Sequence, residues 1–294
     1  MMSICSLVTI YKPDIARLKQ NIEIMLQYSS SVYLLFNSSI TPELQFDARI
    51  VIIDNKKNIG ISRAINKGIN LAVKEGYKYA ILFDQDSILT KENFEKLFLE
   101  MRCEEKEGKI ACIGPSLNIR NNKVPIHNWI RNKKVVQSKE VISVNCIITS
   151  GMLINIKYFL EINGFNEDFP VDFCDFLFCW KALYKGYSVI QSKDAYIIHE
   201  VGINDLKILG HTINIHSPYR NYFLVRDTLN ICFKIKETPM RCRFRFLFFL
   251  PFRLFLFLLL DQKMMRLKMY WMGFIDFLMS KKHFGSIAKM LDAE

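Results

Sequence analysis

The chain has 294 residues, of which 50% are apolar and 23% are charged. This composition excludes a disordered chain, and the small numbers of glycine (12) and proline (8) exclude collagen-like and low-complexity sequence. The formal net charge is +11, and most of the excess lies in residues 234–294, which contain 12 basic and 5 acidic residues. The eight cysteines form no CxxC pair, so we expect reduced thiols. Met1 to Cys5 lack the basic and apolar regions of a signal peptide, so we expect a cytoplasmic protein.

The first part of the chain alternates between strand and helix patterns. Short apolar runs predict strands at residues 3–10, 32–36, 50–53 and 79–83. Apolar residues at helical spacing predict helices at residues 15–28 and 61–73. The order strand, helix, strand, strand, helix, strand, with short connections, predicts an α/β fold in which helices cover a largely parallel sheet.

The second part is less regular. We expect a helix at 91–105, strands at 110–114 and 141–148, a short helix after Gly151, an acidic loop, a helix to about residue 185, and strands near 189 and 197. The polar stretch 116–139 is predicted to be a loop. Because the composition changes at Ile231, we expect one domain over residues 1–230 and a basic, aromatic helical region over 231–294.

Two aspartates follow the fourth predicted strand in the sequence Asp84-Gln85-Asp86-Ser87. Ligands of parallel α/β sheets bind beyond the carboxyl ends of the strands, which is where these carboxylates are expected. Carboxylate oxygens suit Mg²⁺ or Mn²⁺, which would in turn bind a diphosphate. The alternative is that both aspartates cap the helix that starts near Thr90.

Several further motifs occur in one order along residues 3–230. They are Thr9-Ile10-Tyr11-Lys12-Pro13, Asn37-Ser38-Ser39, Asn58-Ile59-Gly60-Ile61-Ser62, Phe83-Asp84-Gln85-Asp86-Ser87, Ile113-Gly114-Pro115, Ser150-Gly151 and Asp172-Phe173-Cys174-Asp175. With these motifs the chain resembles the inverting glycosyltransferases of family 2, which have the GT-A fold, and their bacterial rhamnosyltransferase branch in particular.

The resemblance implies a role for each matching residue. Asp84 and Asp86 would hold Mg²⁺ or Mn²⁺, with His199 as a third candidate ligand, and Asp175 would be the catalytic base, with Asp172 as the second choice. The implied contacts with the nucleotide-sugar donor are Thr9, Tyr11, Asn37, Asn58, Gly60, Asp84, Gln85, Ser150, Gly151, Arg220 and Arg226. Relatives often have an acidic residue two positions after the catalytic base, where this chain has Leu177. Many relatives also have an aspartate that contacts the nucleotide base of the donor, where this chain has Phe36. The identity of the nucleotide base in the donor therefore stays open.

The C-terminal region combines aromatic and basic residues. The apolar stretch Phe246 to Leu260 has 15 residues interrupted by Pro251 and Arg253, which is shorter than the roughly 20 that a spanning helix needs. Basic residues on both sides suit a peripheral segment in the interface of an anionic membrane. The alternative is a helical hairpin packed on the catalytic domain or on a second subunit of a homo-oligomer. Nucleic acid is not expected, because the aromatic residues form apolar blocks.

The resemblance therefore implies an enzyme at the inner face of the cell membrane. It would move L-rhamnose from dTDP-L-rhamnose to a lipid-linked saccharide or polysaccharide acceptor in the synthesis of O-antigen or capsule. Two alternatives stay open: the same chemistry with another nucleotide sugar such as a UDP-sugar, or an inactive homologue that acts as a membrane-bound scaffold.

Overall fold

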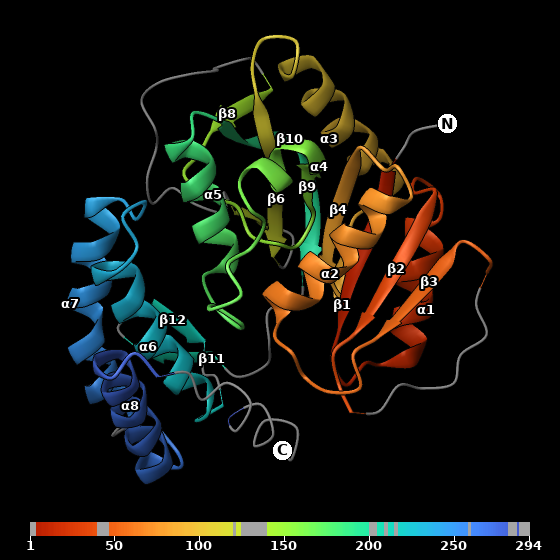
Figure 1. Ribbon diagram of the computed structural model, residues 1–294. Helices are drawn as coiled ribbons and strands as arrows, with labels where there is room; N and C mark the ends of the chain where they lie inside the picture. The colour runs from red at the N-terminus through yellow and green to blue at the C-terminus, as the bar shows by residue number, and fades with distance from the viewer. Residues whose placement is uncertain are drawn as a thin grey trace. The chain divides into compact units, whose positions relative to one another are not determined.

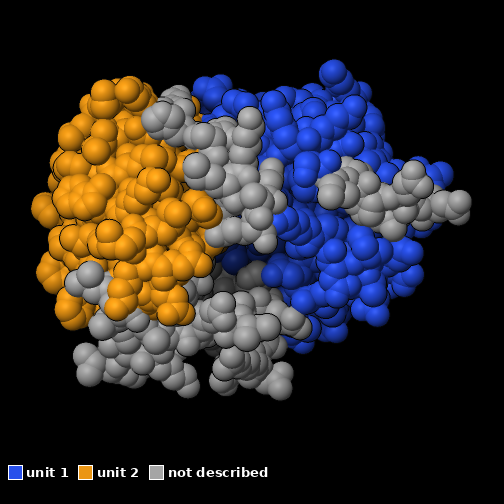
Figure 2. Space-filling model, turned by 90° about the horizontal axis from the view of Figure 1, so that it is seen from below, with its two compact units in different colours: residues 1–167, 174–200 blue, residues 168–173, 201–294 orange. Residues whose placement is uncertain are grey.

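The structure, a computed structural model, describes residues 4–39, 47–119, 122–124, 140–199, 205–208, 211–214, 217–257, 260–281 and 287. The chain forms two compact units (Figure 2). Unit 1 contains Met1–Glu167 and Cys174–Glu200, and unit 2 contains Asp168–Phe173 and Val201–Glu294. The compositional boundary at residue 231 lies inside a helix of unit 2, so the predicted division at 230/231 stays a prediction. Most of the loop predicted at 116–139 lies outside the described residues.

Unit 1 is built on one large sheet (Figure 1). Its main path has the order β3-β2-β1-β4-β9-β6-β10-β5. The strands are β1 (Ile4–Ile10), β2 (Ser31–Phe36), β3 (Ile50–Asp54), β4 (Tyr79–Asp84), β5 (Ser87–Ile88), β6 (Ile110–Ile119), β9 (Met152–Asn155) and β10 (Ser188–His199). Neighbours among β3, β2, β1 and β4 are parallel, β9 is antiparallel to both its neighbours, and β6 is parallel to β10. Two short strands, β7 (Asn122–Val124) and β8 (Val141–Ser143), pair with β6 and β10.

Helices cover both faces of this sheet. On one face, α1 (Ile15–Met25) and α3 (Lys91–Glu104) pack against alternate strand residues such as Val8 and Leu34. On the other face, α2 (Ile61–Lys74), α4 (Ile156–Glu161) and α5 (Cys174–Tyr184) pack against Leu7, Leu35 and their neighbours. Figure 1 shows α2 in front of the first strands and α1 behind them. The predicted α/β fold, with a mostly parallel sheet between helices, is confirmed.

The sequence did not reveal every strand. The four-residue strand β9 lies between β4 and β6, directly after Gly151, where only a short helix was expected. It is buried and runs without a break into α4, so it carries no alternating pattern. The strand expected at 141–148 is limited to β8, and the two strands expected near residues 189 and 197 form the single strand β10, whose pairing is irregular between Gln191 and Tyr196.

The described part of unit 2 contains a β-hairpin and three long helices. The hairpin joins β11 (Asp205–Ile208) and β12 (His211–Asn214), and the helices are α6 (Arg220–Phe233), α7 (Met240–Phe257) and α8 (Lys263–Leu278). An apolar cluster joins the three helices and includes Leu224, Leu250 and Tyr270. Among the described residues, every helix is too short or too polar to cross a membrane.

The closest approach of α6 and α8 depends on Gly273. A Cβ atom at this position would lie 2.6 Å from the backbone oxygen of Tyr222 and 3.3 Å from the backbone nitrogen of Arg226. Because backbone atoms inside a helix cannot move aside cheaply, a side chain here would push the two helices apart.

We therefore expect Gly273→Ala to destabilise the protein by about 1 to 3 kcal/mol, the usual cost of overpacking. The measurement is thermal unfolding followed by circular dichroism. Gly108→Ala is the matched control, since a Cβ at Gly108 meets nothing within 4 Å. Equal melting temperatures for the two variants would contradict this account of the α6–α8 contact.

Candidate active site

The topology of unit 1 collects most of the predicted site residues at one edge of the sheet. The parallel strands β1, β2 and β4 end there with Thr9 to Tyr11, Asn37 and Asp84. Helix α2 leads back to the start of β4, and α5 leads back to the start of β10, so both helices begin near the same carboxyl edge. This edge is where parallel α/β sheets bind their ligands.

Asp84 is the last residue of β4, a strand whose other residues are buried. Its Oδ2 atom accepts a hydrogen bond from the hydroxyl of Ser150. Ser150 is only 1% exposed, and the next residue, Gly151, has a positive φ of 77° and donates its backbone N–H to the carbonyl of Leu82 at 2.8 Å. The predicted Ser150-Gly151 motif is thus a turn that fixes the Asp84 carboxylate. A direct contact of Ser150 with the donor stays a prediction.

The backbone between Asp84 and Asp86 is fixed from two directions. The Tyr11 backbone N–H donates to Gln85 Oε1 at 2.8 Å, which joins this turn to the end of β1. From α1, Arg17 Nη2 donates to the Asp86 carbonyl at 2.8 Å and Asn21 Nδ2 donates to the Gln85 carbonyl at 3.0 Å. Thr90, and neither aspartate, caps α3, because its Oγ1 accepts the N–H of Asn93. The helix-cap alternative for Asp84 and Asp86 is therefore wrong.

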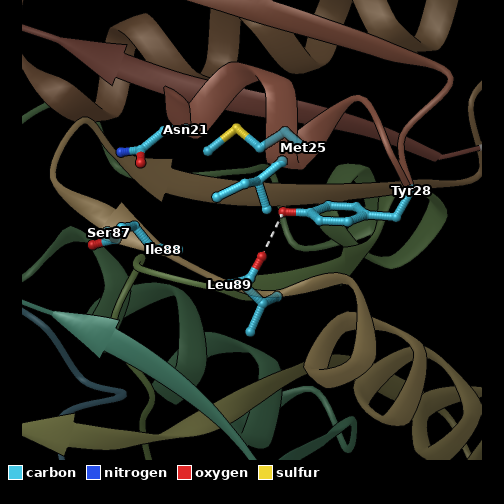
Figure 3. Close-up of a pocket in the computed structure, with 7 residues that line it drawn as sticks. Asn21, Met25, Tyr28, Ser87, Ile88 and Leu89 are labelled. Atoms are coloured by element: carbon cyan, nitrogen blue, oxygen red, sulfur yellow. Dashed lines mark hydrogen bonds between the residues drawn. The ribbon is translucent and has the colours of Figure 1, made fainter. Parts of the chain in front are cut away.

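Sequence reasoning missed the contribution of α1 to this turn. The residues involved, Arg17, Asn21 and Tyr28, recur on α1 and just after it at near-helical spacing, and Asn21 is buried among apolar neighbours. A polar residue at a core position of a helix was the available signal. Figure 3 shows the small pocket between this helix and the segment that follows Asp86, where the Tyr28 hydroxyl donates to the Leu89 carbonyl at 3.4 Å.

His199 reaches the same edge through strand pairing. The backbone of His199, at the end of β10, pairs with that of Ser87, one residue after Asp86. The side chain of His199 lies outside the described part of the structure, so its predicted role as a metal ligand stays a prediction.

A second cluster of polar residues lies after the carboxyl end of β2 and at the start of α2. Asn37 Oδ1 accepts the N–H of Ile59 at 2.9 Å, and Asn37 Nδ2 donates to Asn58 Oδ1 at 3.2 Å. The same Asn58 oxygen accepts the N–H of Gly60 at 3.0 Å. Gly60 is the N-cap residue of α2 and has a φ of 87°. The two asparagines therefore hold together a loop that ends at a helix N-terminus, where anions are favoured.

Asp175 lies in the first turn of α5, and its Oδ1 accepts the N–H of Phe176 at 2.8 Å. The residue that leads into this helix, Phe173, has a positive φ of 65°, which is rare for an aromatic residue. Leu177 is fully buried, so Asp175 is the carboxylate that the start of α5 provides.

The other three predicted residues belong to unit 2. Asp172 forms an ion pair with Arg220, with 2.6 Å between Oδ1 and Nη2. Arg226 is 3% exposed, pairs with Asp227 at 2.6 Å and donates to the Asp168 carbonyl at 2.8 Å. These contacts hold residues 168–173 within unit 2. The predicted roles of Asp172 as a second-choice base and of Arg220 and Arg226 in donor binding stay predictions.

Two buried carboxyl groups have raised pKa values. Burial raises the pKa of Glu100, on α3, to about 7, although Ser192 donates a hydrogen bond to it. Burial also raises the pKa of Asp227, and the charge of Arg226 opposes the shift. Burial is the main cause of both shifts.

The carboxylates at the edge fit a hard divalent cation that is bound together with a ligand. Among the described residues, no three carboxylate, thiol or imidazole groups form a ready-made metal cluster. Asp84 and Asp86, however, are half-buried carboxylates two positions apart on a fixed turn. Mg²⁺ is commonly held by one or two carboxylates plus substrate phosphates and water, and two carboxylates meet that requirement.

Comparisons with known proteins show which proteins this chain is similar to. Residues 33–162 match the family model described as Glycosyl transferase family 2. The dTDP-rhamnosyl transferase RfbF of Shigella flexneri is 28% identical over 235 residues, covering 76% of this chain and 78% of that protein. A crystal structure of GalNAc-T7 with UDP, GalNAc and Mn²⁺ superposes with a TM-score of 0.57 at 10% identity, covering 78% of this chain. The chain spans about half (51%) of the length of that structure, and this likeness concerns the fold.

The fold and these matches support a glycosyltransferase that uses a nucleotide-sugar donor. Residues 33–162 match glycosyltransferase family 2, and the sequence resembles that of a rhamnosyltransferase.

Ser150 provides a test of how the Asp84 carboxylate is held. We expect Ser150→Ala to weaken the binding of a nucleoside diphosphate with Mn²⁺ about tenfold, because hydrogen bonds to charged groups contribute about 1.5 to 3 kcal/mol. Isothermal titration calorimetry measures the affinity, and Thr149→Val, one position earlier, is the control. Wild-type affinity in Ser150→Ala would mean that Asp84 needs no such support.

Proposed function

We propose that the protein is a metal-dependent inverting glycosyltransferase that transfers L-rhamnose from dTDP-L-rhamnose to a lipid-linked saccharide or polysaccharide acceptor in O-antigen or capsule synthesis. The observation that carries this proposal is the fixed turn Asp84-Gln85-Asp86 at the carboxyl edge of the sheet, supported by Ser150, Tyr11 and α1. The likeness to a dTDP-rhamnosyl transferase supports the choice of donor.

In this proposal the donor diphosphate lies at the turn, next to the loop of Asn37 and Asn58. Asp84 and Asp86 would hold Mg²⁺ or Mn²⁺, and the GalNAc-T7 structure with UDP and Mn²⁺ supports a divalent ion in this fold. When bound, the cation neutralises the charge that develops on the leaving nucleoside diphosphate. The chain itself contributes position, since both ends of the turn are tied to neighbouring elements and the carboxylates need little reorganisation when the donor arrives.

Asp175 would act as the general base of the transfer reaction. An acceptor hydroxyl attacks the anomeric carbon while the bond from that carbon to the diphosphate oxygen breaks, so the configuration inverts in one displacement. The hydroxyl proton passes to the Asp175 carboxylate. Its place in the first turn of a helix that begins at the carboxyl edge supports this assignment. Asp172, the second choice from sequence, is held in an ion pair with Arg220 and is less suited to accept a proton.

Two alternatives remain. In relatives an aspartate at the position of Phe36 contacts the nucleotide base of the donor. Phe36 is fully buried in the core, so other residues must make this contact, and a UDP-sugar stays open as donor. An inactive scaffold would bind no donor, and the retained turn at Asp84 to Asp86 argues against it. The proposed acceptor is lipid-linked, which places the enzyme as a peripheral protein at the cytoplasmic face of the membrane. A homo-oligomer is also compatible with this proposal.

The donor assignment is tested by thermal stabilisation with dTDP, UDP and GDP, each with and without Mn²⁺. We expect dTDP with Mn²⁺ to stabilise the protein by about 2.7 kcal/mol at 100 times its dissociation constant. Asp86→Asn should abolish the metal-dependent part, whereas Asp54→Asn, an exposed carboxylate at the end of β3, should not. A larger shift with UDP would change the donor, and no shift with any nucleotide would favour the scaffold.

The base is tested by Asp175→Asn. We expect the transfer rate to fall about 10²- to 10⁴-fold, the usual contribution of a general base, while the dTDP-induced thermal shift stays intact. Asp172→Asn is the comparison, and it should lower the melting temperature through the lost pair with Arg220. If Asp172→Asn alone removes transfer at an unchanged melting temperature, the two roles are the reverse of those proposed.

A further inference from the structure

Helix α7 of unit 2 is apolar on two sides, and only one of them is packed. On the inner side, Leu250 and Phe257 are buried in the cluster that α7 shares with α6 and α8, and Leu247 and Leu254 pack against it. A helix that is apolar all round is normally covered on every side. The outer side of α7 departs from this rule.

Aromatic rings line that outer side. Phe244, Phe248, Phe252 and Phe255 follow one another at spacings of three or four residues, which places them on one face of the helix. They are 68%, 77%, 43% and 59% exposed, respectively. Phe249 extends the face, because its ring centroid lies 5.7 Å from that of Phe248 and 6.3 Å from that of Phe252. Single exposed apolar residues are common, but a row of phenylalanines marks an interaction surface.

The arginines of α7 also divide into packed and exposed residues. Of its four arginines, Arg243 donates to the carbonyls of Thr238 and Cys232, which closes the α6–α7 connection. Arg253 is half-buried, and burial lowers its pKa. Arg241 and Arg245 are exposed, and the guanidinium of Arg245 lies 5.7 Å from the Phe249 ring centroid. The helix contains no acidic residue.

We propose that this outer face of α7, with Arg241, Arg245 and the five phenylalanines, docks the protein on an anionic lipid surface. The helix would lie in the plane of the membrane, with its rings at the boundary between head groups and acyl chains and its two exposed arginines on anionic head groups. It would not span the bilayer, since its 18 residues include Pro251 and four arginines. The inference deepens the proposed function, because it gives a lipid-linked acceptor and the enzyme a common surface.

The charge pattern favours lipid over a second copy of the chain. Two such faces placed against each other would bring four arginines together with no acidic partner on α7. An anionic lipid surface supplies the missing negative charge, and it accepts aromatic rings without the matched shape that a protein interface needs.

The aromatic part is tested by flotation with vesicles of equal parts phosphatidylglycerol and phosphatidylcholine. We expect the purified full chain to float with these vesicles, and the variant Phe248→Ser/Phe255→Ser to bind at least tenfold more weakly. The matched control is Leu99→Ser/Leu160→Ser, two leucines of unit 1 that are 65% and 44% exposed, which should bind like the wild type.

The basic part is tested with Arg241→Gln/Arg245→Gln on the same vesicles. A basic residue near an anionic surface contributes about 1 kcal/mol, or roughly fivefold in affinity, so the double variant should lose roughly 25-fold. Lys106→Gln/Lys109→Gln, two exposed lysines of unit 1, is the charge-matched control and should bind normally. Vesicles of phosphatidylcholine alone should bind the wild type weakly.

The outcomes separate this inference from the proposed function. Equal vesicle binding by wild type and both α7 variants would overturn it, as would light scattering showing a dimer that Phe248→Ser/Phe255→Ser dissociates without any loss of vesicle binding. The thermal shift with dTDP and Mn²⁺, measured without lipid, should be the same in the wild type and the α7 variants. A wild type that floats but shows no nucleotide shift would refute the transferase and leave the docking face standing.

Discussion

Asp84 ends a strand that is buried along its length, and its carboxylate has to be held at the point where the chain leaves the core. A partly buried charge is costly unless polar groups surround it. The Ser150 hydroxyl provides one such group, and the turn that carries Ser150 is in turn fixed by the hydrogen bond from Gly151 to Leu82. The start of β9 and the end of β4 are therefore bound to each other twice, once through the backbone and once through the carboxylate. The antiparallel strand β9, in the middle of a mostly parallel sheet, is thus tied to the Asp84 end of β4.

The same constraint extends to the first helix. The turn after Asp84 exposes two carbonyl groups, those of Gln85 and Asp86, and both receive side-chain donors from α1. The Gln85 side chain meanwhile accepts the Tyr11 N–H, at the end of the strand that precedes α1. Backbone polar groups that leave a sheet without partners are destabilising, so these bonds stabilise the turn in the absence of any ligand. A preorganised turn of this kind presents its carboxylates with little entropy left to lose when a donor binds.

The parts that could be predicted from sequence are those with a local pattern. The first four strands and the helices between them have apolar spacing that only one structure satisfies, and the two aspartates follow such a strand directly. The contribution of α1 could not be found in this way, because Arg17 and Asn21 act on residues more than 60 positions away. The role of Arg226 could not be decided from the sequence for a related reason. Its motif resembles that of phosphate-binding arginines, yet its guanidinium is buried against Asp227 and the Asp168 carbonyl, and only tertiary packing decides between these two uses.

Residues 168–173 come just before the proposed base, Asp175, in the chain. They lie between two segments of unit 1, yet they pack in unit 2, where Arg220 and Arg226 hold Asp172 and the Asp168 carbonyl. Asp175 lies two positions after this segment, which ends with the strained backbone of Phe173. A strained residue persists only when its surroundings hold it in place, and here unit 2 anchors the residues just before it. Helix α6, which carries both arginines, also packs against α7 through the apolar cluster of unit 2. The helix that presents the aromatic face is thus packed on the helix that anchors residues 168–173, so the proposed lipid-binding face and the anchor of the segment before Asp175 belong to the same small helical unit.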